Sequence, residues 1–176
     1  MYYIEQDNKI KIFDVDKIKL QNTVEFMPQY KGLEIKESAI DIVEFDGQFY
    51  FVDDENYLIA KAQKEAERIK SLSMTRSDFF DGTIKAFSLT QEKLKSAIEP
   101  ILVNLDINEI DKTIAMNNYD NALNFYRKHP LFDLLSGLSI PISETQSIMI
   151  NAEQWDKFFD ETSKKNPEAY KELLPM

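Results

Sequence analysis

Carboxylates are the only reactive side chains that this chain carries in quantity. Its 176 residues include 31 aspartates and glutamates against 21 lysines and arginines, one histidine and no cysteine. The lack of cysteine excludes disulfides, thiolate metal sites and a cysteine nucleophile. The single histidine, His129, excludes a metal site with two histidine ligands. Because it precedes Pro130 at the end of an expected helix, where a cation is favoured by the last carbonyls, we predict a structural role for it.

Two stretches place acidic or amide side chains at spacings that resemble a calcium-binding loop. One begins at Asp14 and the other at Asn104. Such a loop needs glycine at its sixth position for a sharp turn, and these stretches have Lys19 and Glu109 there. We therefore interpret both stretches as helix caps. The sequence predicts neither a bound metal nor a cofactor.

A denser acidic group surrounds an expected β-hairpin. It consists of Asp41, Glu44, Asp46, Asp53, Asp54 and Glu55. On a regular strand Asp41 and Glu44 point to opposite faces, so they cannot act together as an acid and a base without a bulge. Two interpretations remain. The group is either a solvated sheet edge followed by a helix N-terminus, or an acidic patch that binds a basic surface on a partner protein.

The net charge of −10 limits the classes of partner. A chain this acidic is repelled by phosphate backbones, so we predict no direct binding to nucleic acid. It suits a basic groove on another protein, including one that holds DNA or RNA. Solubility alone would also explain the charge.

Two pairs of adjacent phenylalanines are candidates for partner contacts. These pairs are Phe79–Phe80 and Phe158–Phe159. Neighbouring residues on a helix point about 100° apart, so one ring of each pair is a candidate for exposure as an interface anchor. Phe80 and Phe159 are the rings that we assign to partner binding.

The glycines exclude the common nucleotide-binding loops. The four are Gly32, Gly47, Gly82 and Gly137, too far apart to form a glycine-rich phosphate loop. With no other catalytic motif in the chain, the sequence predicts a protein that is not an enzyme.

The elements that would position these residues begin with a β-rich segment. Residues 9–13 alternate between polar and apolar, as in a half-buried strand, and Asp16 is a good helix N-cap. Residues 40–45 and 48–52 are apolar runs joined by Asp46-Gly47, which predicts a hairpin. A charged helix should follow over residues 55–72.

The remainder of the chain is expected to be mainly helical. Thr75, Thr90 and Asn108 are predicted N-caps, and the helix that begins at Asn108 is expected to continue to near His129. Asn151 with Gln154 predicts a capping box, and residues 166–167 should begin a last short helix. The predicted fold class is α+β, with a small antiparallel N-terminal sheet followed by a helical bundle. We divide it into residues 1–74 and 75–176, although both could form one compact unit.

No apolar run approaches the length of a membrane span, and the first five residues lack the pattern of a signal peptide. We therefore expect a soluble protein that stays in the cytoplasm where it is made.

Three segments resemble a group of small proteins encoded by phages and prophages. They are residues 71–80 (SLSMTRSDFF), 126–132 (YRKHPLF) and 154–159 (QWDKFF). The resemblance covers about half of the chain, mainly its C-terminal portion, and carries over no functional residues.

This resemblance implies a phage gene acting in a bacterial cytoplasm and two kinds of work. The first is inhibition of a host defence effector, as in anti-CRISPR proteins, some of which occupy a basic channel for nucleic acid. The alternative is a tail-assembly chaperone or a minor structural protein of the virion. The sequence favours the inhibitor slightly because of its charge, and leaves the partner's identity and the oligomeric state open.

Overall fold

The protein has an α+β fold that consists of two compact units, Met1–Glu65 and Ala66–Met176. The computed structural model describes residues 1–105 and 108–165. The predicted fold class, with an antiparallel N-terminal sheet followed by a mainly helical region, is confirmed. The expected helix at residues 166–167 lies outside the described residues.

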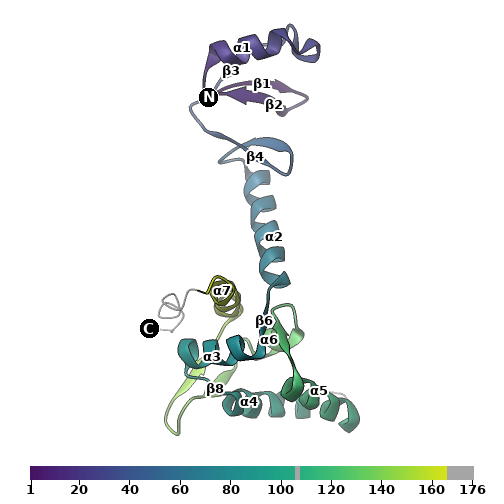
Figure 1. The fold of residues 1–176 in the computed structure, drawn as a ribbon, viewed down its shortest axis with the longest axis vertical. Coiled ribbons are helices and arrows are strands. Elements are labelled where there is room, and N and C mark those ends of the chain that lie inside the picture. The colour runs from purple at the N-terminus through teal and green to yellow at the C-terminus, as the bar shows by residue number, and fades with distance from the viewer. Residues whose placement is uncertain (106–107, 166–176) are drawn as a thin grey trace. The chain divides into compact units, whose positions relative to one another are not determined.

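The N-terminal unit is built on a five-stranded antiparallel sheet (Figure 1). The strand order is β3-β1-β2-β5-β4. Its elements are β1 (Tyr2–Gln6), β2 (Lys9–Asp14), α1 (Lys17–Glu25), a 3₁₀ turn (Pro28–Tyr30), β3 (Lys36–Glu37), β4 (Ile42–Phe45), β5 (Gln48–Phe51) and the start of α2 (Glu55–Ser71).

Two tight hairpins set the register of this sheet. Asp46 and Gly47 have φ angles of 50° and 74°, and Phe45 pairs with Gln48, which confirms the predicted hairpin. A second hairpin joins β1 to β2 through Asp7 and Asn8, both with φ of 56°. This second turn is not among the predicted ones, because Asp7-Asn8 lacks the glycine that usually marks a turn with positive φ.

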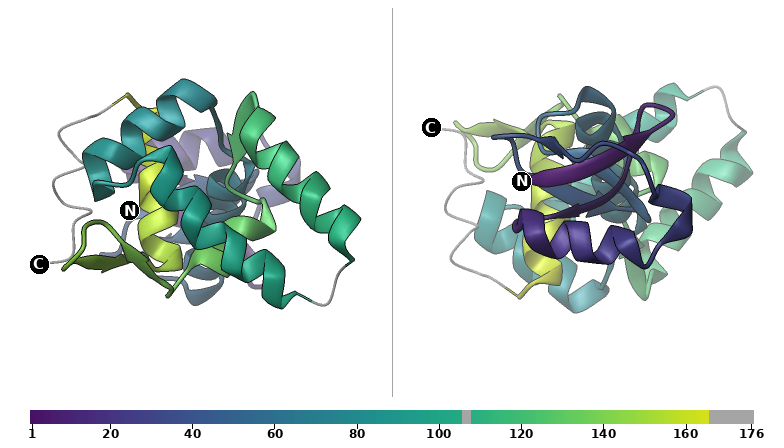
Figure 2. Two further views of the ribbon diagram at one scale, coloured as in Figure 1. Left: turned by 90° about the horizontal axis from the view of Figure 1, so that it is seen from below. Right: turned by 90° about the horizontal axis from the view of Figure 1, so that it is seen from above.

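The small core of this unit lies on both faces of the sheet. Helix α1 packs along β1 and β2, where Ile4 and Leu20 are buried (Figure 2, right). Two ring pairs, Tyr3–Phe51 and Phe13–Phe49, each meet edge to face at 5.2 Å between centroids and join the two hairpins. The edge-to-face geometry is the favoured one for aromatic rings.

The C-terminal unit contains five complete helices and two small two-stranded sheets within its described residues. Its elements are β6 (Ser73–Thr75), α3 (Arg76–Phe87), α4 (Gln91–Asn104), α5 (Glu109–Asn121), β7 (Asn124–Tyr126), α6 (Pro130–Leu135), β8 (Ser139–Pro141), β9 (Ser147–Met149) and α7 (Ala152–Ser163). Strand β6 pairs with β7, and β8 with β9. The division between the units falls inside α2, between Glu65 and Ala66, whereas the boundary predicted from the sequence follows Met74.

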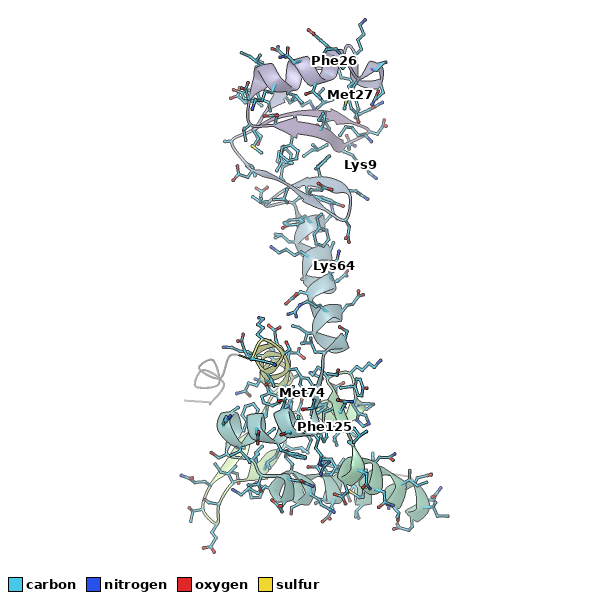
Figure 3. All side chains as sticks on the ribbon, in the orientation of Figure 1. Lys9, Phe26, Met27, Lys64, Met74 and Phe125 are labelled. Atoms are coloured by element: carbon cyan, nitrogen blue, oxygen red, sulfur yellow. The ribbon has the colours of Figure 1, made fainter. Side chains whose placement is uncertain are left out.

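The expected long helix from Asn108 to His129 is wrong in its second half. Helix α5 ends at Asn121, and residues 124–126 form β7, which pairs with β6 through Met74 and Phe125 (Figure 3). Pairing with a segment about fifty residues earlier in the chain buries Phe125, and this tertiary burial outweighs the local helical pattern.

Five helices begin at their predicted caps. Asp16, Thr75, Thr90 and Asn108 each accept a backbone hydrogen bond from the first turn of their helix. Asn151 and Gln154 form the reciprocal capping box at the start of α7.

An aromatic core holds the C-terminal unit together. Phe79 stacks on Phe125 at 4.1 Å between ring centroids, and Phe132 contacts both Trp155 and Phe159 edge to face. These five rings are buried and come from α3, β7, α6 and α7. The core therefore joins elements from most of the length of this unit.

Candidate binding surfaces

An apolar pocket of about 420 Å³ opens in the C-terminal unit. Four elements surround it, namely α4, α5, β7 and α6. Its lining consists of Ile98, Leu102, Ala115, Asn118, Tyr119, Ala122, Asn124, Phe125, Tyr126, His129, Pro130, Leu131, Phe132 and Leu134. The volume lies in the range of pockets that hold small molecules or side chains of a partner protein.

Different elements form the walls of the pocket. Ala115, Asn118 and Tyr119 recur at helical spacing and place one side of α5 against the pocket, and Ala122 follows directly after the helix. The β6–β7 pairing fixes the strand wall, and Pro130 begins α6 at the position where proline is favoured.

Three titratable side chains line the pocket, namely Tyr119, Tyr126 and His129. The Tyr119 hydroxyl donates to the Gln91 carbonyl at 3.2 Å, and burial raises the pKa of this phenol well above its ordinary value, so it stays neutral. His129 is the N-cap of α6, where its Nδ1 accepts a hydrogen bond from the Leu131 N–H at 3.2 Å. The expected position of His129 at a helix C-terminus is therefore wrong, because α5 ends at Asn121 and His129 instead precedes α6.

The border of the pocket is partly apolar. Leu134 and Tyr126 are 42% and 46% exposed, so they can contact a molecule that enters. No short motif in the sequence marks this pocket, because its walls come from segments spread over residues 98–134. Only the apolar spacing on α5 could have indicated part of it.

The six acidic residues predicted to bind a partner lie in the N-terminal unit with different local roles. Asp46 forms an ion pair with Lys64 on α2. Asp54 accepts hydrogen bonds from the Asn56 and Tyr57 N–H groups and caps α2. The remaining four are exposed, and their side chains have no hydrogen bond or ion pair within the described residues: Asp41, Glu44, Asp53 and Glu55.

The two predicted aromatic contacts have different outcomes. Phe158 and Phe159 are both fully buried, so the prediction that one ring of this pair reaches the surface is wrong, and Phe159 is a core residue. Phe80 is half-buried, with its ring against Phe125 at 5.5 Å and the Arg76 guanidinium 4.9 Å above it. Phe80 therefore offers only part of its ring to a partner.

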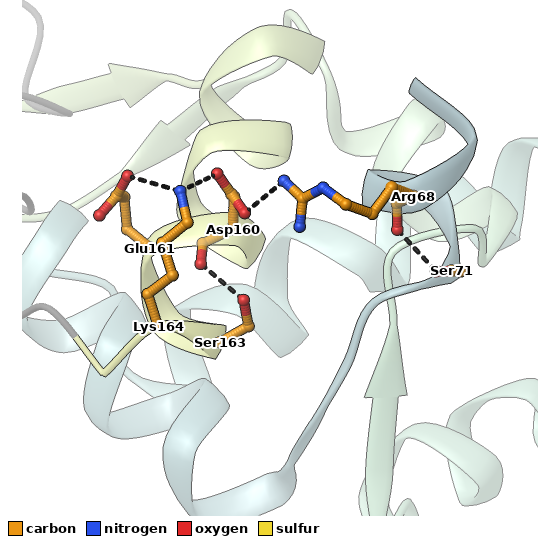
Figure 4. A network of polar contacts seen from close by, with 6 residues as sticks. All are labelled: Arg68, Ser71, Asp160, Glu161, Ser163 and Lys164. Carbon is orange, nitrogen blue, oxygen red and sulfur yellow. Dashed lines mark hydrogen bonds and ion pairs between the residues drawn. The ribbon is translucent and has the colours of Figure 1, made fainter. Parts of the chain in front are cut away.

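A polar network joins the last turn of α2 to α7 within the C-terminal unit (Figure 4). Asp160 accepts hydrogen bonds from Arg68 at 2.7 Å and from Lys164 at 2.6 Å. Burial raises the pKa of Asp160, but these two hydrogen bonds and the charges behind them outweigh it and hold the pKa below its ordinary value.

The network predicts an acid-sensitive contribution to stability. Because the folded pKa of Asp160 is depressed, its contribution is present above the unfolded pKa of about 3.9 and is lost as pH falls through the folded value. Asp160→Asn should therefore lower the free energy of unfolding at pH 7. On acidification, the free energy of unfolding of this variant should fall less than that of the wild type. The check is urea unfolding followed by Trp155 emission at pH 7 and at about pH 3. Glu99→Gln, at an exposed position on α4, is the control and should follow the wild type.

Within residues 1–105 and 108–165, no group of three or more histidine or acidic residues is placed to hold a metal ion. Over the same residues, no helix has both the length and the apolar character needed to cross a membrane.

Comparison of the chain with protein-family models, with curated proteins and with solved structures gives no significant match to any of them.

Proposed function

We propose that this chain is a non-catalytic protein that works by binding another protein, and that the pocket of the C-terminal unit receives apolar side chains of that partner. The pocket carries the proposal, because it combines a volume of about 420 Å³ with a mainly apolar lining and an exposed apolar border. Aromatic or aliphatic anchors buried in such pockets supply most of the binding energy at protein interfaces.

The apolar pocket favours an assembly role as the first candidate. In the phage setting that the sequence resemblance implies, this is a tail-assembly chaperone or a minor structural protein of the virion. Assembly interfaces are held largely by apolar burial, so their affinity changes little with ionic strength.

A second candidate is an anti-CRISPR-like inhibitor in the bacterial cytoplasm, acting on a basic effector that binds nucleic acid. Residues 37–60 favour it, because they contain seven carboxylates and no lysine or arginine. An interface built on these charges should weaken as the salt concentration rises.

A single charge at the pocket border tests the proposal. We expect Leu134→Glu to reduce recovery of the partner at least about tenfold, because complex formation would bury an unpaired carboxylate. The measurement is affinity capture with the tagged chain from a bacterial host lysate, with and without nuclease, followed by mass spectrometry. Leu138→Glu is the matched control, since Leu138 is 37% exposed against 42% for Leu134 and does not line the pocket.

The identity of the captured protein separates the two roles. Recovery of tail proteins that does not depend on nuclease or salt supports the assembly role. Recovery of a basic effector that is loaded with guide RNA and released by salt supports the inhibitor role. A partner retained equally by the wild type and both variants, or lost equally from both variants, contradicts a role for the pocket. Unchanged Trp155 emission shows that each variant is folded.

A further inference from the structure

Strand β4 is an edge of the five-stranded sheet. Among the described strands it pairs only with β5. The two-residue turn makes Phe45 and Gln48 a hydrogen-bonded pair. Four residue pairs further along the hairpin, the Val52 N–H donates to the Asp41 carbonyl at 3.0 Å. Hydrogen-bonded and non-hydrogen-bonded pairs alternate along an antiparallel ladder. The main-chain N–H and C=O groups of Ile42 and Glu44 therefore point away from β5.

These outward groups form a template for another strand. No strand or side chain in the described parts of the molecule bonds to them. An edge with unpaired donors and acceptors can accept an extended peptide by main-chain pairing, as in domains that bind by strand addition.

The charges around β4 decide which strand could pair there. Asp41 and Glu44 lie on or beside the edge strand, and Asp53 and Glu55 follow the hairpin, all four without a partner side chain among the described residues. A second copy of β4 would add its own carboxylates beside those of this strand, and the repulsion between like charges is destabilising. A strand that carries lysine or arginine would meet opposite charges instead.

The two faces of β4 define the pattern of such a strand. Val43 and Phe45 share one face and are half-buried, with the Phe45 ring 5.6 Å from that of Tyr57. Glu44 lies on the opposite face and is exposed. A complementary segment would therefore alternate basic side chains beside Glu44 with apolar side chains beside Val43 and Phe45.

We propose that the edge of β4 is a docking site for an extended, basic segment of a partner protein, which adds a sixth strand to the sheet. This inference rests on the proposed function only in assuming that the partner is a protein. The site lies in the N-terminal unit and shares no residue with the pocket, so the failure of one does not imply the failure of the other.

A synthetic peptide tests the site on the full chain without a known partner. The probe is a capped seven-residue peptide that alternates lysine and valine, and the control alternates glutamate and valine. In ¹⁵N-labelled protein, the lysine peptide should shift the amide resonances of Ile42 and Glu44 and slow their hydrogen exchange at least about tenfold. The control peptide should do neither. If the lysine peptide shifts resonances of residues with exposed carboxylates but does not slow hydrogen exchange at Ile42 and Glu44, it binds by charge alone. That result would overturn strand addition.

Two substitutions at one position separate main-chain pairing from charge. Glu44→Gln keeps the outward N–H and should weaken peptide binding about two- to fivefold, as expected for one exposed ion pair. Glu44→Pro removes that N–H without removing a hydrogen bond to β5, and proline is tolerated at such an outward position of an edge strand. This variant should weaken peptide binding more than about tenfold. Unchanged Gly47 and Tyr57 amide resonances show that the hairpin is intact.

A modified peptide gives the same answer without changing the protein. Methylation of alternate amide nitrogens in the lysine peptide keeps its charge and removes its ability to pair along one edge. The methylated peptide should give no exchange protection at Ile42 or Glu44. Equal binding by both peptides would falsify strand addition at β4.

Discussion

Phe79→Ala is expected to lower the free energy of unfolding of the C-terminal unit by about 3–5 kcal/mol, the range for removing a buried aromatic ring. Phe79 is 2% exposed and lies at the centre of the aromatic core. It stacks on Phe125 at 4.1 Å and meets Phe132 and Phe158 at 5.8 Å and 5.9 Å between centroids. This loss of stability includes the free energy of transferring the ring out of water and the cost of the cavity that the ring leaves.

Trp155 provides the measurement, because it is the only tryptophan, is fully buried and lies in the same core. Urea unfolding followed by its emission reports on the C-terminal unit alone. Ile84→Ala is the control on the same helix. Because Ile84 is 48% exposed, this substitution should lower the free energy of unfolding by less than about 1 kcal/mol. A Phe79→Ala variant as stable as the Ile84→Ala variant would show that the core is not packed as described.

This substitution should also affect the pocket. Phe125 lines the pocket and is held from behind by the Phe79 ring. In the folded fraction of Phe79→Ala, Phe125 can move into the vacated space. We therefore expect weaker capture of the partner from this variant even under conditions where most of it is folded.

Arg127→Met is expected to destabilise the C-terminal unit by about 2–4 kcal/mol. The Arg127 side chain is 4% exposed and donates to Asp156 at 2.6 Å, to Asp133 at 3.2 Å and to the Ala152 carbonyl at 3.4 Å. It therefore connects the residue after β7 to α6 and α7. Asp133 is 71% exposed and Asp156 is 36% exposed, so water can solvate the carboxylates that remain, which limits the loss.

A double-mutant cycle with Asp156→Asn separates this ion pair from the packing of the arginine side chain. The coupling energy should be about 1–2 kcal/mol, and Arg127→Lys should recover only part of the loss, because lysine cannot donate in three directions from a planar group. Unfolding is again followed by Trp155 emission. If Arg127→Met changed the free energy of unfolding by less than about 0.5 kcal/mol, that result would contradict the role of Arg127 in connecting β7 to α6 and α7.

The fold class and most helix starts could be predicted because their signals are local. The Asp46-Gly47 turn needs only two residues with positive φ, and an N-cap such as Thr75 or Asn151 bonds to an N–H three residues away. Interactions within four residues are present in the sequence itself, so pattern and structure agree at these positions.

The sequence by itself therefore determined the Asp46-Gly47 turn, most of the helix caps and the order of a sheet followed by helices. Only the tertiary structure decided that residues 124–126 form a strand, that Phe159 is buried, and that the pocket and the free β4 edge exist. Each of these features depends on segments that lie far apart in the chain. Burial of apolar surface between such segments outweighs local preference, and a local pattern does not record which distant partner will provide it.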